Sequence, residues 1–158
     1  MSARRERRVK ARNKTLTVWL AVLGGHLGLH RFYLRGLGDW IGWLHPIASA
    51  LGWWGIERVQ EFGQDDPLSW VLIPFLGMSI AAACLAGIVY ALADRPRWNG
   101  WFNPGLPSED ISGATNWLTV GALVLSLMVG AVAFMSSLAF AFQHYYEYQV
   151  DEARKISQ

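Results

Sequence analysis

Charged residues are absent from four long stretches of this 158-residue chain, at positions 15–29, 40–56, 67–93 and 111–146. A helix needs about 20 apolar residues to cross a hydrocarbon core of about 30 Å. The third and fourth stretches exceed that length, and the first two are shorter. The stretches are apolar on all sides, whereas strands of a membrane barrel alternate apolar and polar residues. Backbone groups in lipid must bond within their own segment. The pattern therefore predicts an all-α, multi-pass membrane protein with four transmembrane helices, at about 15–29, 40–56, 68–93 and 114–142.

These helices divide the chain into a basic arm (1–14), a first helix pair (15–58), a linker (59–67), a second helix pair (68–142) and a tail (143–158). Seven of the fourteen Lys and Arg residues lie in the arm. Such a run can bind nucleic acid or act as a nuclear address. Directly before an apolar helix it instead indicates a cytoplasmic anchor, because cytoplasmic segments are enriched in Lys and Arg. We therefore expect the lipid bilayer as a partner and no nucleic acid.

Four crossings with a cytoplasmic N-terminus leave ten Lys and Arg residues inside and four outside. This asymmetry predicts that both termini face the cytoplasm, in a bacterial plasma (inner) membrane. The outer loop, 94–113, is rich in Gly and Pro, so we expect it to be irregular. Its aromatic residues Trp98, Trp101 and Phe102 are expected to rest on the outer interface, or to form a recognition surface.

Small residues recur at helical spacing. Gly24 and Gly28 form one such pair, and Gly38 and Gly42 form another. Small residues four apart let helix backbones approach closely in a membrane. We expect packing faces within the chain, with contacts in a homo-oligomer as the alternative. The later helices carry similar sets, namely Ala83, Gly87 and Ala91, and Ala122, Ser126 and Gly130.

The residues His30, Arg31, Phe32, Tyr33 and Leu34 follow a glycine-rich helix end. This stretch resembles the signature turn of the TM2 domain family. The stretch 53–57, which ends in Glu57, resembles the end of that family's second helix. The resemblance covers about residues 14–58, and it departs from the family pattern at His26 and Arg35. It implies a hairpin of two membrane helices and no general enzymatic activity.

The chemistry of the turn allows two interpretations. Arg31 could bond the free carbonyls at the end of the first helix, where a cation complements the helix dipole, or it could pair with Asp39 across the turn. Phe32 and Tyr33 would hold the turn at the level of the lipid headgroups. We expect a structural clamp, and a site for a ligand or partner is the alternative.

His26 and His30 are four residues apart, which is metal-ligand spacing, with Asp39 or His45 as a third candidate. Zinc needs three or four protein ligands, and no closed set is evident, so we predict neither a metal nor a cofactor. No catalytic motif occurs, so no enzyme is predicted. We expect a structural or accessory factor that acts through helix–helix contacts with its own copies or other membrane proteins. The alternative is a subunit of a small oligomeric channel or transporter.

Overall fold

The computed structural model describes residues 11–157, so most of the basic arm lies outside the described residues. Across this part of the chain the regular structure is entirely helical, which confirms the predicted all-α class. The elements are α1 (Lys14–Gly24), the 3₁₀ turn η1 (Gly25–Leu27), α2 (Leu29–Arg35), α3 (Trp40–Phe62), α4 (Pro67–Leu92), α5 (Arg95–Phe102), the 3₁₀ turn η2 (Ile111–Gly113) and α6 (Trp117–Ile156).

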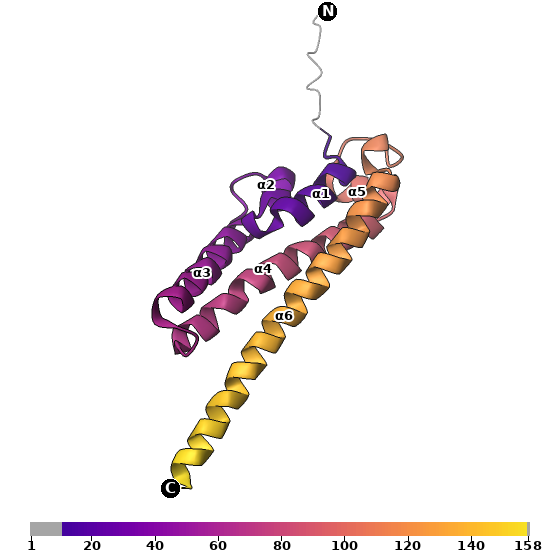
Figure 1. Ribbon diagram of the computed structural model, residues 1–158. Helices are drawn as coiled ribbons and strands as arrows, with labels where there is room; N and C mark the ends of the chain where they lie inside the picture. The colour runs from indigo at the N-terminus through magenta and orange to yellow at the C-terminus, as the bar shows by residue number, and fades with distance from the viewer. Residues whose placement is uncertain (1–10, 158) are drawn as a thin grey trace, which may run out of the picture.

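The long helices α4 and α6 lie side by side and run in opposite directions (Figure 1). Their contact is built from small residues. A methyl group added to Gly87 would meet the Ser126 hydroxyl oxygen at 2.9 Å, and one added to Gly130 would meet Cys84 at 2.8 Å. Ala91 and Ala122 are buried together with Val18 of α1, and Ala83 is buried next to Gly25 of η1. The two predicted small-residue faces of these helices are therefore confirmed as packing faces.

Most of the surface of these two helices points outward. Two segments, α4 and the stretch 111–156, are long and apolar enough to cross a membrane, and only 28% and 22% of their most apolar windows are buried. Leu85 on α4 and Val132 on α6 are 62% and 67% exposed. A core helix of a soluble domain would cover such side chains, because exposed apolar patches of this extent mark an interaction with membrane or protein. Two of the four predicted spans thus have the properties of a membrane-crossing helix.

Helix α3 packs against α4 through glycines. A methyl group on Gly52 would meet the Leu76 backbone nitrogen at 2.5 Å, and one on Gly55 would meet Leu72 at 2.8 Å. At the end of this pair Arg58 and Asp66 form an ion pair at 2.8 Å. Asp66 also accepts from the Ser69 backbone N–H at 3.1 Å and so caps the start of α4. Helix α3 is therefore held along α4 as far as the connection between them, six residues beyond the end predicted at residue 56.

The first helix is much shorter than predicted, and it does not continue to residue 29. With 11 residues and 1.5 Å of rise per residue, α1 is about 16 Å long, about half of a hydrocarbon core. The chain leaves α1 at Gly25 and reverses at Gly28, whose φ of 73° lies in the left-handed region that favours glycine. Helix α2 then returns toward the start of α1, where the Asn13 backbone N–H donates to the Tyr33 hydroxyl at 3.0 Å.

The start of α1 lies beside the loop 94–113, because α1 packs against α4 and α6, the two helices that this loop connects. The Lys14 ammonium donates to the Ala93 carbonyl at 2.8 Å and to the Thr115 hydroxyl at 2.6 Å. These contacts place the start of α1 and the loop at the same end of the long helices, whereas the sequence led us to expect them on opposite sides of a bilayer. Residues 11–14 and the end of α6 lie at opposite ends of the long helices (Figure 1), which disagrees with the prediction that both termini share one side.

The loop is also more ordered than its Gly and Pro content predicts. It contains α5, and Trp98 on this helix is fully buried and does not rest on an interface. At the other end of the chain, α6 continues 14 residues past the predicted end at residue 142. The apolar pattern ends there, but the following residues remain good helix formers.

Candidate functional sites

The predicted turn motif lies on α2 and is closed by an ion pair. The Arg31 Nε donates to Asp39 Oδ2 at 2.8 Å, and Nη2 donates to Oδ1 at 3.3 Å. Both side chains are largely buried. The hydrogen bond from Arg31 lowers the pKa of Asp39. Asp39 also accepts from the Ile41 backbone N–H at 3.2 Å and caps α3. Of the two partners expected for Arg31, the structure shows Asp39, which joins the hairpin to the start of α3.

The aromatic residues of the motif pack the hairpin onto α3. The Phe32 ring lies 5.1 Å from the Trp43 ring, and a methyl group on Gly42 would stand 2.6 Å from Phe32. The guanidinium of Arg12 lies over the Tyr33 ring at 5.4 Å. Leu34 is buried. The motif therefore forms one connected unit with the segment that precedes α1.

The four glycines predicted to pack behave differently from one another. A methyl group on Gly28 would clash with the Gly42 carbonyl oxygen, so these two glycines lie in contact. The atoms nearest to a methyl group on Gly24 belong to Leu29 of its own hairpin, and Gly38 has no atom of a neighbour within 4 Å of such a group. Glu57 is not near the turn: it lies nearly five turns along α3 and accepts from the exposed Trp53 indole N–H at 3.0 Å.

Two histidines meet where the hairpin contacts α3 and α4. His30 is fully buried, and its ring centroid lies 5.3 Å from that of His45. His45 Nδ1 lies 3.2 Å from the hydroxyl of Ser79. Among residues 11–157, neither ring nitrogen of His30 has a hydrogen-bond partner. A buried polar group without a partner is costly, so this ring is the feature of the hairpin that packing alone does not explain.

The structure does not assemble the predicted metal-ligand candidates into a ligand set. Within residues 11–157, no three His, Cys, Asp or Glu side chains lie together in a group that could hold an ion. His26 contributes its backbone carbonyl, which accepts from the Ser49 hydroxyl at 2.7 Å. The sequence named His45 only as one of two candidates for a third ligand beside His26 and His30, and it did not predict a direct contact of the His30 and His45 rings without His26. The signal that could have found this contact is the presence of two ionisable side chains within apolar segments.

A buried polar network connects the N-terminal segment to the loop that contains α5, and the sequence did not predict it. The Arg12 backbone N–H donates to Asn103 Oδ1 at 2.6 Å, and the Arg12 carbonyl accepts from the Trp98 indole at 2.9 Å. The Asn103 amide also donates to Asn99 at 2.9 Å and to Ser112 at 2.9 Å. These side chains are 8% exposed or less. The network holds α5 and η2 over the start of α1.

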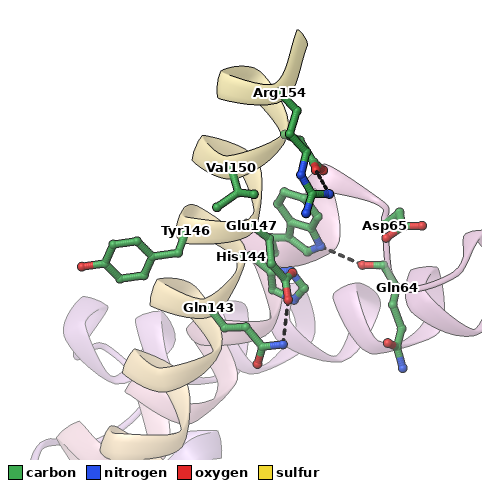
Figure 2. Close-up of a pocket in the computed structure, with 10 residues that line it drawn as sticks. Gln64, Asp65, Gln143, His144, Tyr146, Glu147, Val150 and Arg154 are labelled. Atoms are coloured by element: carbon green, nitrogen blue, oxygen red, sulfur yellow. Dashed lines mark hydrogen bonds and ion pairs between the residues drawn. The ribbon is translucent and has the colours of Figure 1, made fainter. Parts of the chain in front are cut away.

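At the opposite end, a cavity of about 520 Å³ lies between the α3–α4 connection and the last turns of α6 (Figure 2). His144 stacks on Trp70, with ring centroids 4.4 Å apart, and its Nδ1 lies 3.1 Å from a Glu147 carboxylate oxygen. The Trp70 indole donates to the Gln64 carbonyl at 2.8 Å. Most of the remaining lining is polar and exposed, so the cavity is an open junction that fixes where α6 leaves the bundle.

Comparison of the chain with protein-family models, curated proteins and solved structures found no match. The functional argument therefore depends on the geometry of these sites.

Proposed function

We propose that this protein is an integral membrane protein that crosses the bilayer three times, through α3, α4 and α6. Helices α4 and α6 are supported as spans by their length and their outward apolar surface. Helix α3 is held along α4 from Gly52 to Arg58, so it must share the depth of α4. In this arrangement α1 and α2 form a re-entrant hairpin, which enters the bilayer and returns to the same side. The shortness of α1 and the contact of Lys14 with Ala93 support this arrangement.

The charge distribution supports one orientation of this topology. Of the nine Lys and Arg residues within 11–157, six lie at the end that holds the hairpin and α5, and three (Arg58, Arg154 and Lys155) lie at the other end. The five in residues 1–10 directly precede the first end in sequence, which gives eleven against three. This asymmetry exceeds that of the four-crossing arrangement. Under the positive-inside rule the basic end is cytoplasmic. The end of α6 then lies outside the cytoplasm of a plasma membrane.

Within this topology the protein acts as a non-enzymatic structural or accessory factor through helix contacts, and residues 14–58 form a TM2-type unit whose first helix is re-entrant. The observation that supports this role best is the projection of α6 beyond the ends of α3 and α4 (Figure 1). Tyr145, Tyr146 and Tyr148 lie at the base of this projection, where α6 passes the start of α4, and they are 54–64% exposed. Tyrosine is enriched at the energetic centres of protein interfaces, so the base of the projection is suited to bind another membrane protein or a second copy.

Site-specific photocrosslinking tests this role. A photoreactive residue at Tyr148 should give one defined adduct in membranes, either a dimer of the chain or a complex with one partner. The same residue at Val132, in the exposed apolar surface at the middle of α6, serves as the matched control for lipid-facing positions. Equal, diffuse labelling at both positions would contradict a role for the projection in binding.

A transport subunit is the second candidate, and the unpartnered His30 ring favours it. Broken helices that bring backbone and polar side chains to membrane depth form the binding sites of many transporters. The purified chain in liposomes loaded with a pH-sensitive dye tests this candidate. Proton flux that disappears in His30→Phe, but persists in the exposed variant Gln149→Ala, would favour transport over the accessory role.

A further inference from the structure

A groove of about 580 Å³ opens at the basic end of the molecule, between α2, α4 and the end of α5. Its wall is mainly apolar and aromatic, and Arg35 is its charged residue. The wall also includes Leu34, Val89, Tyr90, Trp101 and Phe102. Within the wall, the Phe102 ring packs edge-on against the Tyr90 ring, with centroids 5.6 Å apart. Trp101 is half exposed. The groove therefore offers an apolar surface to whatever surrounds the protein.

With α4 spanning the bilayer as proposed above, the groove lies near the boundary between hydrocarbon and headgroups. Val89 and Tyr90 lie within the last turn of α4, which ends at Leu92. Arg35 is the last residue of α2, and Gly36 ends that helix with a φ of 82°. An amphiphilic molecule in the leaflet would thus meet apolar side chains first and a guanidinium at the end of α2.

The guanidinium of Arg35 is available, whereas that of its neighbour is not. Arg31 engages both carboxylate oxygens of Asp39. Arg35 is exposed, and within residues 11–157 it forms no ion pair. Arginine presents a planar fork of donors that matches phosphate oxygens. Charge complementarity therefore favours an anionic occupant over a zwitterionic or neutral one.

We propose that this groove binds one anionic phospholipid, with its phosphate on Arg35 and the upper part of an acyl chain along Leu34, Val89 and Trp101. Basic pockets between membrane helices on the cytoplasmic side bind anionic headgroups by the same physics. The inference goes beyond the accessory role, but it rests on the insertion of α4 in the bilayer.

Native mass spectrometry of the full chain, released from nanodiscs that contain equal amounts of dioleoylphosphatidylcholine and dioleoylphosphatidylglycerol, tests the proposal. We expect one retained phosphatidylglycerol, and a fall of about fivefold in its retention over phosphatidylcholine in Arg35→Gln, since one interfacial cation contributes about that factor. Arg97→Gln removes the same charge at the same end from an exposed residue of α5 that does not line the groove. Its retention should equal that of the unmodified chain.

A second measurement keeps the test independent of folding defects. Dibrominated phosphatidylglycerol should quench Trp101 more than dibrominated phosphatidylcholine does, as judged by the difference between the unmodified chain and Trp101→Phe. Equal losses in Arg35→Gln and Arg97→Gln, or no selectivity in the unmodified chain, would overturn the proposal. Displacement of the lipid by inorganic phosphate would assign the site to a free anion and would also overturn it. Failure of the chain to enter nanodiscs would instead refute membrane insertion itself.

Discussion

Replacing Asn103 by alanine tests the arrangement of the whole basic end, because this side chain joins two segments that the four-helix prediction placed on opposite sides of a membrane. Asn103 is 1% exposed. Its amide accepts from the Arg12 backbone N–H at 2.6 Å and donates to the Arg12 carbonyl at 3.2 Å. It also donates to Asn99 and Ser112 at 2.9 Å each.

The size of the effect follows from these four contacts. A hydrogen bond contributes about 1 kcal/mol net, and a buried group left without a partner costs about 1–3 kcal/mol. The Trp98 indole still donates to the Arg12 carbonyl in the variant, so the loss falls mainly on the Arg12 N–H and on the two polar neighbours. We expect Asn103→Ala to lower the free energy of unfolding by about 2–4 kcal/mol.

Unfolding of the purified protein by sodium dodecyl sulfate in dodecyl maltoside, followed by helical circular dichroism, measures this difference. Gln149→Ala is the matched control, since it removes an exposed amide from α6 and should change the free energy by no more than about 0.5 kcal/mol. Ser112→Ala should show a coupling of at least about 0.5 kcal/mol with Asn103→Ala, because the two side chains are in contact. If Asn103→Ala is as mild as the control, the N-terminal segment and the loop 94–113 do not meet, and the re-entrant hairpin is wrong.

Three further predictions address other parts of the chain. Alkaline phosphatase fused after Gln158 should be active, and green fluorescent protein fused at the same position should be dark. The reverse result would show that the C-terminal tail faces the cytoplasm. Gly28→Leu should destabilise the protein by at least about 2 kcal/mol, because it places a side chain on a left-handed backbone and creates a clash. Gly38→Leu adds the same side chain in open space and should have a much smaller effect. Equal thermal midpoints of the two variants would contradict the contact of Gly28 with Gly42. Hydrogen bonds from Arg58 and Ser69 hold the pKa of Asp66 below its usual 3.8. The stabilising contribution of Asp66 is therefore present above about pH 4 and is lost as the pH falls further. The thermal midpoint of the protein should drop between pH 6 and pH 3, and a drop of the same size in Asp66→Asn would exclude Asp66 as the cause.

The sequence predicted the elements that depend on apolar length. Helix α4 was expected at 68–93 and is found at Pro67–Leu92, because a long apolar run between charged residues leaves little choice of boundary. The small residues Gly87 and Ser126 were also predicted to pack, since helical spacing fixes which side chains share a face.

The hairpin of α1 and α2 could not be predicted in the same way. A run without charges indicates that a segment can enter a bilayer, but it does not show whether the segment crosses or returns. That choice depends on contacts such as those of Lys14 and Asn103, which follow no periodicity and join residues about 80–100 positions apart. For the same reason the sequence could name His45 only as one candidate beside His26 and His30, and could not single out its contact with His30.

In the turn between α1 and α2, the backbone N–H and carbonyl groups lack the hydrogen bonds of a regular helix. The packing around the turn supplies partners for them and covers them. Irregular backbone is tolerated at membrane depth only where protein covers it. The Gly28 backbone N–H donates to the Gly25 carbonyl at 2.8 Å, and the Ser49 hydroxyl of α3 donates to the His26 carbonyl at 2.7 Å. A methyl group on Gly25 would clash with Ala83 of α4, and one on Gly28 would clash with the Gly42 carbonyl oxygen of α3. The glycines of the turn therefore let α3 and α4 close over the reversal, so that the same residues that break α1 also cover the break.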